Sequence, residues 1–153
     1  MSITCCYIKE QYFKDHSSFV KMLDPGNTAK QSHRSYLCLK ITNDGNDYYL
    51  PLRNNLGADV RPYGRIGHSV PSASRSDAGL DYRYALIVND SKYIEIPTTQ
   101  KIPNRQWNKI TADYNNIISE FTVYLSGFKR AVKRKTVLTE KRYIENHLLL
   151  ISL

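Results

Sequence analysis

The alternation of apolar and polar residues predicts a β-hairpin in the first third of the chain. Apolar residues occupy every second position between Tyr36 and Thr42, which is typical of a strand with one buried face. A second run, Tyr48 to Leu52, is rich in aromatic and branched residues, and Asp44-Gly45 between the runs supplies the positive φ of a hairpin turn. Pro51 lacks an N–H, so we expect it at a sheet edge, a bulge or a strand end.

Further strands are expected on both sides of this hairpin. Residues 2–7 are short and β-prone, and residues 80–89 become continuously apolar, which is typical of a buried central strand. Residues 93–96 alternate again after a turn at 89–91. About five strands joined mostly by hairpins predict an antiparallel sheet.

Helices are expected near the start of the chain and in its last third. Residues 9–22 carry apolar side chains at roughly helical spacing, and residues 27–33 follow as a polar loop. From Asn104 apolar residues recur at steps of three and four over about six turns, which predicts a long amphipathic helix that packs on the sheet. We interpret its stripe as core rather than a cofactor site: Trp107, Ile110, Tyr114, Ile117, Phe121, Tyr124 and Phe128.

The region from Leu56 to Asp81 is the least regular part of the chain. A loop of this length is uncommon in a compact domain and is often functional. Within it, residues 64–69 could bring backbone amides, the Arg65 guanidinium and the His68 imidazole to one phosphate. No Gly-Lys-Ser/Thr follows, so a nucleotide-binding P-loop is not supported.

The composition is basic and rich in tyrosine. The 153 residues include 22 Lys and Arg against 14 Asp and Glu, a net charge of +8, and 12 Tyr. Cations meet phosphates and aromatic rings stack on bases, so this composition is compatible with RNA or DNA. The densest basic cluster could bind phosphate, or could only complement the C-terminus of a helix: Lys129, Arg130, Lys133, Arg134 and Lys135.

Several classes of protein find no support in the sequence. Three cysteines predict no disulfide framework, and four scattered histidines form no metal-binding motif. No Gly-x-Ser-x-Gly indicates a hydrolase triad. No apolar run reaches the roughly 18 residues of a membrane span, so we expect one cytoplasmic domain over residues 1–153. Metal-free cleavage of RNA stays open, because its 2′-hydroxyl is the nucleophile and the protein need supply only a base, an acid and cations.

Five stretches, taken in order, carry a resemblance to a known family. They are a starting strand and Tyr-bearing helix at 4–23, Arg34-Ser35-Tyr36, Tyr49-Leu50-Pro51-Leu52 with a polar tip, Gly79-Leu80-Asp81, and the long helix. In this order they resemble the toxins of type III toxin–antitoxin systems, the ToxN/AbiQ/TenpN group of RNA-inhibited endoribonucleases. The sharpest piece is Tyr-Leu-Pro-Leu followed by polar residues.

This resemblance implies an α+β fold, an activity and a partner. The fold would be a strongly twisted antiparallel sheet of about five or six strands with flanking helices and a barrel-type core, related to the MazF/Kid toxins. The activity would be metal-independent and cofactor-free cleavage of RNA that leaves 2′,3′-cyclic phosphate and 5′-hydroxyl ends. The partner would be a small repeated RNA antitoxin that folds as a pseudoknot and is cut from its precursor by the toxin. Toxin and RNA would form a ring or another higher-order assembly. The system would defend the cell against phage by abortive infection.

The resemblance also implies roles for individual residues. Tyr12 is similar to the family's active-site tyrosine, and Arg34 occupies the basic position before the hairpin. Arg53 and Asn54 occupy the tip where ToxN-like members place a small hydroxyl pair and a lysine, so the chain is nearer the TenpN branch. His68 is then the candidate acid or base, and the arginines would clamp the phosphate while Asn54 orients it. RNA binding is expected of the other cations: Arg61, Arg65, Lys129, Arg130, Lys133, Arg134 and Lys135.

Two alternatives remain at this point. A non-catalytic RNA- or DNA-binding module could use the C-terminal basic cluster, and it would bind RNA in a salt-dependent way without forming product. A structural or protein-interaction domain with a basic face would show no affinity for RNA at moderate salt.

Overall fold

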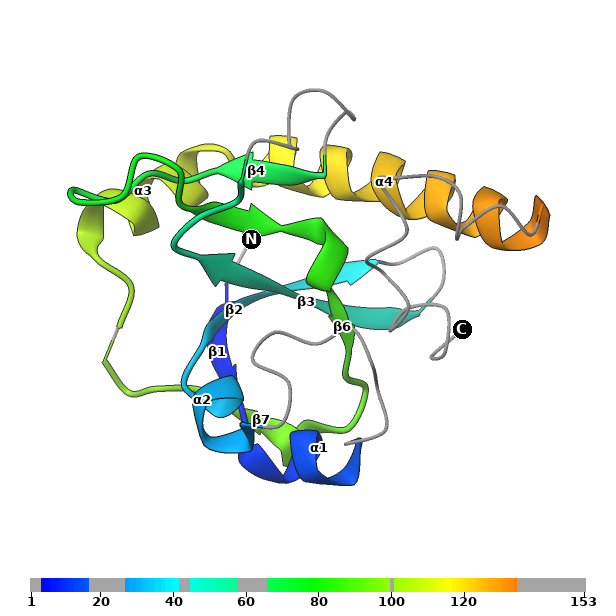
Figure 1. The fold of residues 1–153 in the computed structure, drawn as a ribbon, viewed down its shortest axis with the longest axis horizontal. Coiled ribbons are helices and arrows are strands. Elements are labelled where there is room, and N and C mark those ends of the chain that lie inside the picture. Colours follow the sequence, from blue (N-terminus) through cyan, green and yellow to red (C-terminus); the bar gives the residue numbers. More distant parts are fainter. Residues whose placement is uncertain (1–3, 17–26, 42–44, 58–65, 100, 135–153) are drawn as a thin grey trace.

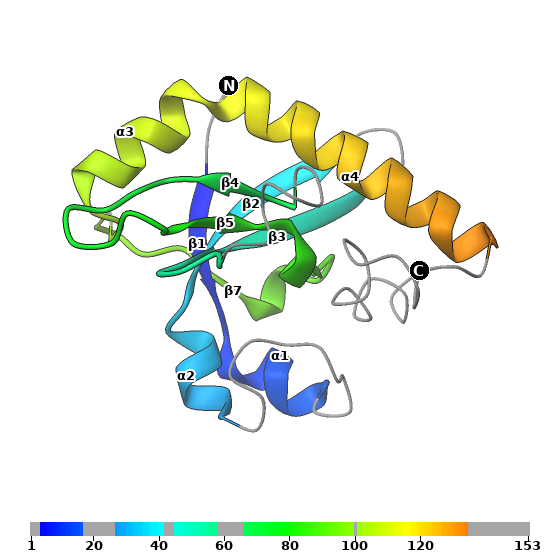
Figure 2. The same cartoon turned by 45° about the horizontal axis from the view of Figure 1, so that its top comes forward.

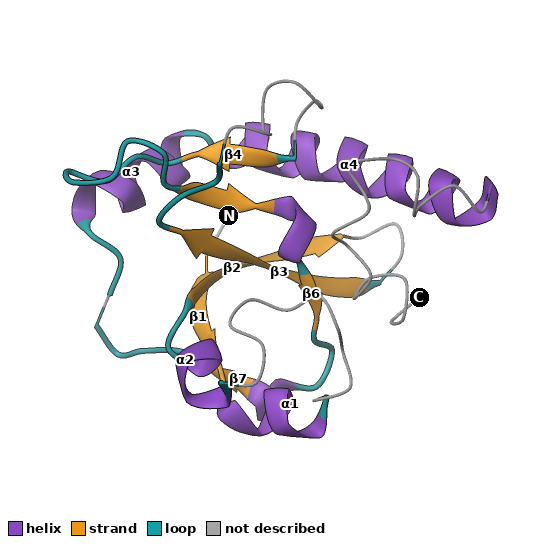
Figure 3. Ribbon diagram, viewed as in Figure 1, coloured by secondary structure: helices purple, strands orange, loops and turns teal. Residues whose placement is uncertain are grey.

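The structure is a computed structural model that describes residues 4–16, 27–41, 45–57, 66–99 and 101–134. It is an α+β fold built on one antiparallel sheet with flanking helices (Figures 1 and 3). Helices α3 (Asn104–Ala112) and α4 (Tyr114–Arg134) cover one face of the sheet. Helices α1 (Glu10–Asp15) and α2 (Thr28–Ser32) lie on the other side of the molecule (Figure 2). The predicted fold class and the long C-terminal helix are confirmed.

The predicted hairpin forms the centre of the sheet. Strand β2 (Ser35–Ile41) pairs with β3 (Asn46–Arg53) in a register that runs from Tyr36 opposite Pro51 to Ile41 opposite Asn46. Gly45 before β3 has a φ of 74°, as the predicted turn requires.

The other strands extend the sheet on both sides of the hairpin. The order is β4-β5-β3-β2-β1-β7, and β6 also pairs with β3. Every pairing is antiparallel. The bounds are β1 Thr4–Ile8, β4 Gly67–Ser69, β5 Gly79–Asp81, β6 Leu86–Ile87 and β7 Ile94–Glu95.

Pro51 lies in a central strand but at a break in its pairing. On the flank of β3 away from β2, β6 pairs with Tyr48 and Tyr49, and β5 pairs with Leu52 and Arg53. Pro51 falls between these two partners, so on this flank it has no pairing for its missing N–H to interrupt, and on the other flank it lies opposite Tyr36 of β2.

The sheet is open, so the expected barrel-type core is not formed. Strands β4 and β7 lie at opposite ends of the strand order and, among the described strands, β4 pairs only with β5 and β7 only with β1. The described sheet has seven strands rather than about five or six, and four of them are only two or three residues long.

The single central strand predicted over 80–89 is wrong. The chain leaves β5 for the 3-10 helix η2 (Tyr82–Tyr84) before β6 begins. The Asp81 carboxylate accepts the Arg83 N–H at 3.1 Å and so stabilises this turn. The hairpin expected across 89–91 is wrong as well, because β6 pairs with β3 whereas β7 pairs with β1.

The expectations for helices also need correction in two places. Residues 27–33, expected as a loop, contain α2, and the Asn27 side chain caps it by accepting the Lys30 N–H at 3.0 Å. The long C-terminal helix divides at Asp113, whose N–H donates to Lys109 O while its own carbonyl accepts the Ile117 N–H. None of the helices among the described residues is long and apolar enough to span a bilayer.

Two apolar cores lie on the two faces of the sheet. Leu37, Leu39 and Ile41 face the stripe of α3 and α4, in which Ile110, Ile117, Phe121 and Phe128 are fully buried. The alternate residue Tyr36 packs instead with Tyr12 and Phe13 of α1 on the opposite face. The period-two pattern of β2 therefore separates the two cores, and the predicted apolar stripe of the long helix is confirmed as core.

Candidate active site

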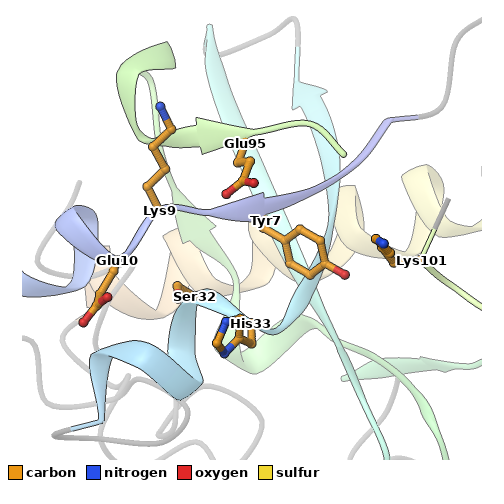
Figure 4. A pocket seen from close by; sticks show the side chains of 7 residues that line it. All are labelled: Tyr7, Lys9, Glu10, Ser32, His33, Glu95 and Lys101. Carbon is orange, nitrogen blue, oxygen red and sulfur yellow. The ribbon is translucent and has the colours of Figure 1, made fainter. Parts of the chain in front are cut away.

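Two hollows in the surface share His33 as a lining residue. The first, which we name the cationic hollow, has a volume of about 300 Å³ and is lined by Lys30, His33, Arg34, Ser35, Leu52, Asn54 and Gln106. The second, which we name the Tyr7 hollow, has a volume of about 490 Å³ and is shown in Figure 4. It is lined by Tyr7, Lys9, Glu10, Ser32, His33, Glu95 and Lys101.

The short helix α2 holds the residues that the two hollows have in common. Its Gln31 is buried, with 3% of its surface exposed, and anchors the helix. The helix ends at His33, whose N–H donates to Lys30 O at 3.3 Å, and the Arg34 N–H donates to Gln31 O at 3.3 Å. These bonds fix the backbone of His33 and Arg34 between the helix and β2, while the His33 side chain stays exposed.

Strand register brings Asn54 to the same hollow as Arg34. Tyr36 is paired with Pro51 in the antiparallel hairpin, so the residues before Tyr36 lie beside those after Pro51. Gln106 of α3 completes the lining, and its Nε2 donates to Val70 O at 2.8 Å. The cationic hollow therefore combines an imidazole, a guanidinium, an ammonium and two carboxamides, and none of the described residues in its lining is a carboxylate.

The Tyr7 hollow has a different electrostatic character, because it contains two carboxylates. Glu10 accepts a hydrogen bond from Thr28 Oγ1 at 2.7 Å and pairs with Lys14 at 3.4 Å. The Thr28 hydrogen bond and the Lys14 charge lower the pKa of Glu10 below its usual value. Glu95 lies on edge strand β7, directly opposite Tyr7 of β1.

Arg53 follows Leu52 but does not line either hollow. Its Nη1 donates to Asp81 Oδ2 at 2.8 Å, and its guanidinium lies 5.0 Å from the centre of the Tyr84 ring. Arg83 binds the same fully buried carboxylate through Nε and Nη2, at 3.0 and 2.9 Å. Two guanidinium groups thus share one carboxylate, which leaves this cluster with a net positive charge.

His68 lies between two carboxylates and also lines neither hollow. Its Nε2 is 2.9 Å from Asp113 Oδ2 and its Nδ1 is 2.9 Å from Glu120 Oε1. Tyr82 donates to the same Glu120 oxygen at 2.9 Å. Lys109 lies 2.7 Å from Asp113, and hydrogen bonds from Lys109 and His68 lower the pKa of Asp113. His68 is buried, with 8% of its surface exposed. Its two hydrogen bonds connect β4 to the junction of α3 and α4.

Tyr12 is part of the core beneath α1. It is 3% exposed, and its ring contacts Phe13, His16 and Tyr93. Its hydroxyl donates to Ile87 O at 3.4 Å, a long hydrogen bond, and burial raises the pKa of Tyr12. Of the five predicted catalytic residues, the structure therefore brings Arg34 and Asn54 together, and it places Tyr12, Arg53 and His68 elsewhere.

Comparison with known proteins finds similar structures and no match by sequence. No family model matches the sequence, and no curated protein matches it. A solved structure reported as "A processed non-coding RNA regulates a bacterial antiviral system" aligns with 87% of this chain and 88% of its own, at a TM-score of 0.56 and 12% identity. The two chains share a fold. A second, reported as "New insights into the mechanism of bacterial Type III toxin-antitoxin systems: selective toxin inhibition by a non-coding RNA pseudoknot", aligns over 97% and 90% at 18% identity, with a TM-score of 0.44.

The cations predicted to bind RNA are only partly described. Lys129, Arg130 and Lys133 lie on the last turns of α4, where Arg130 and Lys133 are exposed and Lys129 is half-buried. Arg134 ends the helix, but its side chain lies outside the description, as do residues Arg61, Arg65 and Lys135. The RNA-binding role of this set stays a prediction.

Sequence reasoning missed the residues that surround Arg34 and Asn54. Lys30 and His33 fell in a segment taken for a loop, although Asn27 before Thr28 was a usable N-cap signal for a helix. Tyr7 and Lys101 are far apart in the sequence, and only the pairing of β1 with β7 brings these regions to one hollow.

Proposed function

We propose that the chain is the toxin of a type III toxin–antitoxin system, an endoribonuclease that a small repeated RNA inhibits. The observation that carries the proposal is the cationic hollow, where His33 stands exposed beside Arg34, Lys30 and Asn54. The shared fold supports it, because the protein of the solved structure belongs to an antiviral system that a processed non-coding RNA regulates.

The cationic hollow contains the groups that are needed when the 2′-hydroxyl of an RNA attacks the adjacent phosphate. An imidazole can take a proton near neutral pH, so His33 is the proposed general base for the 2′-hydroxyl. The oxygen then attacks phosphorus, the bond to the 5′-oxygen breaks, and the products are a 2′,3′-cyclic phosphate and a 5′-hydroxyl. Because the hollow is open to water, solvent can protonate the leaving oxygen.

Two cations in the hollow would stabilise the charge that develops on the phosphate. The Arg34 guanidinium can bind two phosphate oxygens at once, and Lys30 adds a second positive charge. The Asn54 carboxamide would orient the phosphate through a hydrogen bond. Since no step in this scheme uses a metal ion, we propose that cleavage is metal-independent.

Other parts of the earlier prediction stay predictions. These are the cyclic or higher-order assembly with the antitoxin and the defence against phage. The catalytic roles that the resemblance implies for Tyr12, Arg53 and His68 are alternatives to this scheme, which does not use them. The exposed Arg130 and Lys133 favour one alternative, a binding module that holds RNA without cutting it.

The test is incubation of purified protein with total RNA in excess EDTA, followed by mapping of the cut ends. We expect cyclic-phosphate ends at a recurring motif, and loss of cleavage in His33→Ala and Arg34→Ala. Arg75→Ala is the matched control, because Arg75 is an exposed arginine that lines neither hollow. Intact RNA that binds the wild-type protein would favour the binding module instead.

A further inference from the structure

The Tyr7 hollow contains one carboxylate with no partner among the described residues. The Glu95 side chain makes no hydrogen bond or ion pair with the residues that the structure describes, whereas Glu10 is engaged by Thr28 and Lys14. A carboxylate only accepts hydrogen bonds. A ligand that fills this hollow beside Glu95 should therefore present hydrogen-bond donors.

Tyr7 and Glu95 are placed to act on the same ligand. They are directly opposite each other on antiparallel strands, so their side chains leave the same face of the sheet with Cβ atoms about 5 Å apart. Tyr7, Glu95 and His33 all line this hollow, and Figure 4 shows His33 near the Tyr7 ring and the Glu95 carboxylate across strand β1 from them. An aromatic ring next to a hydrogen-bonding group is the usual means by which proteins bind an unpaired base.

The chemistry of the base edges favours guanine as this ligand. Guanine presents two neighbouring donors, N1–H and an N2 hydrogen, which match the two oxygens of a carboxylate. Adenine and cytosine place a ring-nitrogen acceptor beside their amino group, and uracil flanks its one N–H with two carbonyls. Glu95 would therefore face a repelling lone pair with each of the other three bases.

We propose that Tyr7 and Glu95 form a subsite for an unpaired guanine of RNA, next to the phosphate that is cleaved at His33. The inference rests on the proposed function and adds a base preference to it. Because His33 lines both hollows, a nucleotide on Tyr7 has its phosphate within the reach of the cationic hollow. Lys101, in the same hollow as Tyr7, supplies a further cation for the backbone of that nucleotide.

The test measures binding and cleavage separately with matched RNAs. Short oligouridines that carry one guanine or one adenine are used as 2′-O-methyl RNA for binding, since the nucleophile is blocked, and as unmodified RNA for cleavage. The variant is Glu95→Gln, which keeps the shape but offers one donor and one acceptor, the pattern that adenine matches. Asp77→Asn is the control, because it removes one negative charge at an exposed residue that lines neither hollow.

We expect the wild-type protein and the Asp77→Asn control to bind the guanine RNA at least about tenfold more tightly than the adenine RNA. Glu95→Gln should lose this preference or reverse it, and its cleavage motif should change in the same direction. Cleavage by the wild type with no guanine preference, or an unchanged preference in Glu95→Gln, would overturn the subsite and leave the proposed function standing. Guanine-selective binding that depends on Glu95, without any cleavage by the wild type, would overturn the nuclease and support the subsite.

Discussion

Asn54 and Arg34 line one hollow because the β2–β3 hairpin holds them there. The pairing of Tyr36 with Pro51 fixes the open end of the hairpin, and the two residues flank that end on its two strands. Arg34 directly precedes β2 and Asn54 directly follows β3, so the hairpin holds a guanidinium and a carboxamide at one hollow. Such a mount suits groups that must be aimed at a phosphate.

The first prediction concerns Arg34. Replacing it by alanine removes the bidentate cation from the cationic hollow and should lower kcat for RNA cleavage by about 10²- to 10³-fold, as loss of one transition-state donor typically does. Arg34→Lys should recover only part of the rate, since an ammonium cannot bind two oxygens in the same geometry. Single-turnover rates of these variants and of Arg75→Ala check this, with a denaturation curve for each to confirm folding. A rate near that of the wild type in Arg34→Ala would remove this residue from the mechanism.

His68 is predicted to matter for stability and not for cleavage. His68→Ala leaves the Asp113 and Glu120 carboxylates facing each other's charge without the ring that now separates them. We expect a loss of about 1 to 3 kcal/mol in the free energy of unfolding, as when a buried hydrogen-bonding group is left without its partner. Urea denaturation measures this, and the cleavage rate below the unfolding transition should change little. A folded variant that had lost cleavage would restore His68 as the acid or base.

The ion cluster around His68 also predicts how stability depends on pH. The folded-state pKa of Asp113 is lowered by Lys109 and His68, so its contribution is present above the usual carboxyl pKa and is lost as the pH falls through the lowered value. Asp113→Asn should reduce stability at pH 7 and flatten its decline in acid. Denaturation curves at neutral and acidic pH compare the two proteins. Parallel declines would show that Asp113 does not carry this dependence.

For Tyr12, the family resemblance and the structure lead to opposite expectations about a role in cleavage. Its hydroxyl makes one long hydrogen bond in a buried cluster and burial raises its pKa, so the phenol stays neutral and away from both hollows. Tyr12→Phe should therefore cost no more than about 1 kcal/mol of stability and leave cleavage unchanged. The same single-turnover assay checks this. A hundredfold slower Tyr12→Phe would instead support the active-site role that the resemblance implies.

The hairpin and the amphipathic helices could be predicted because their signals are local. The alternation in β2, the Gly45 turn and the stripe from Ile110 to Phe128 each depend on neighbours within a few residues. The predictions failed where distant partners decide the structure. The strand expected over 80–89 breaks after Asp81, whose buried carboxylate binds Arg53, a residue 28 positions away.

In the candidate site, too, residues set by local sequence could be predicted and those set by distant partners could not. Arg34 and Asn54 could be found because the hairpin that joins them was visible in the sequence. The sequence offered His68 as a candidate acid or base but did not show its partners, Asp113 and Glu120, which lie 45 and 52 residues away. His33 was passed over because α2 is a single short helix with little periodicity, held by an N-cap and one buried glutamine.

In the proposed mechanism the cationic hollow cleaves RNA, with His33 as the general base. The most direct measurement is single-turnover cleavage of RNA in excess EDTA by the wild type, His33→Ala and His68→Gln, with analysis of the product ends. We expect 2′,3′-cyclic phosphate ends from the wild type and from His68→Gln, and a rate at least about 10²-fold lower for His33→Ala. Full activity in His33→Ala, or RNA left intact by the wild type, would contradict it.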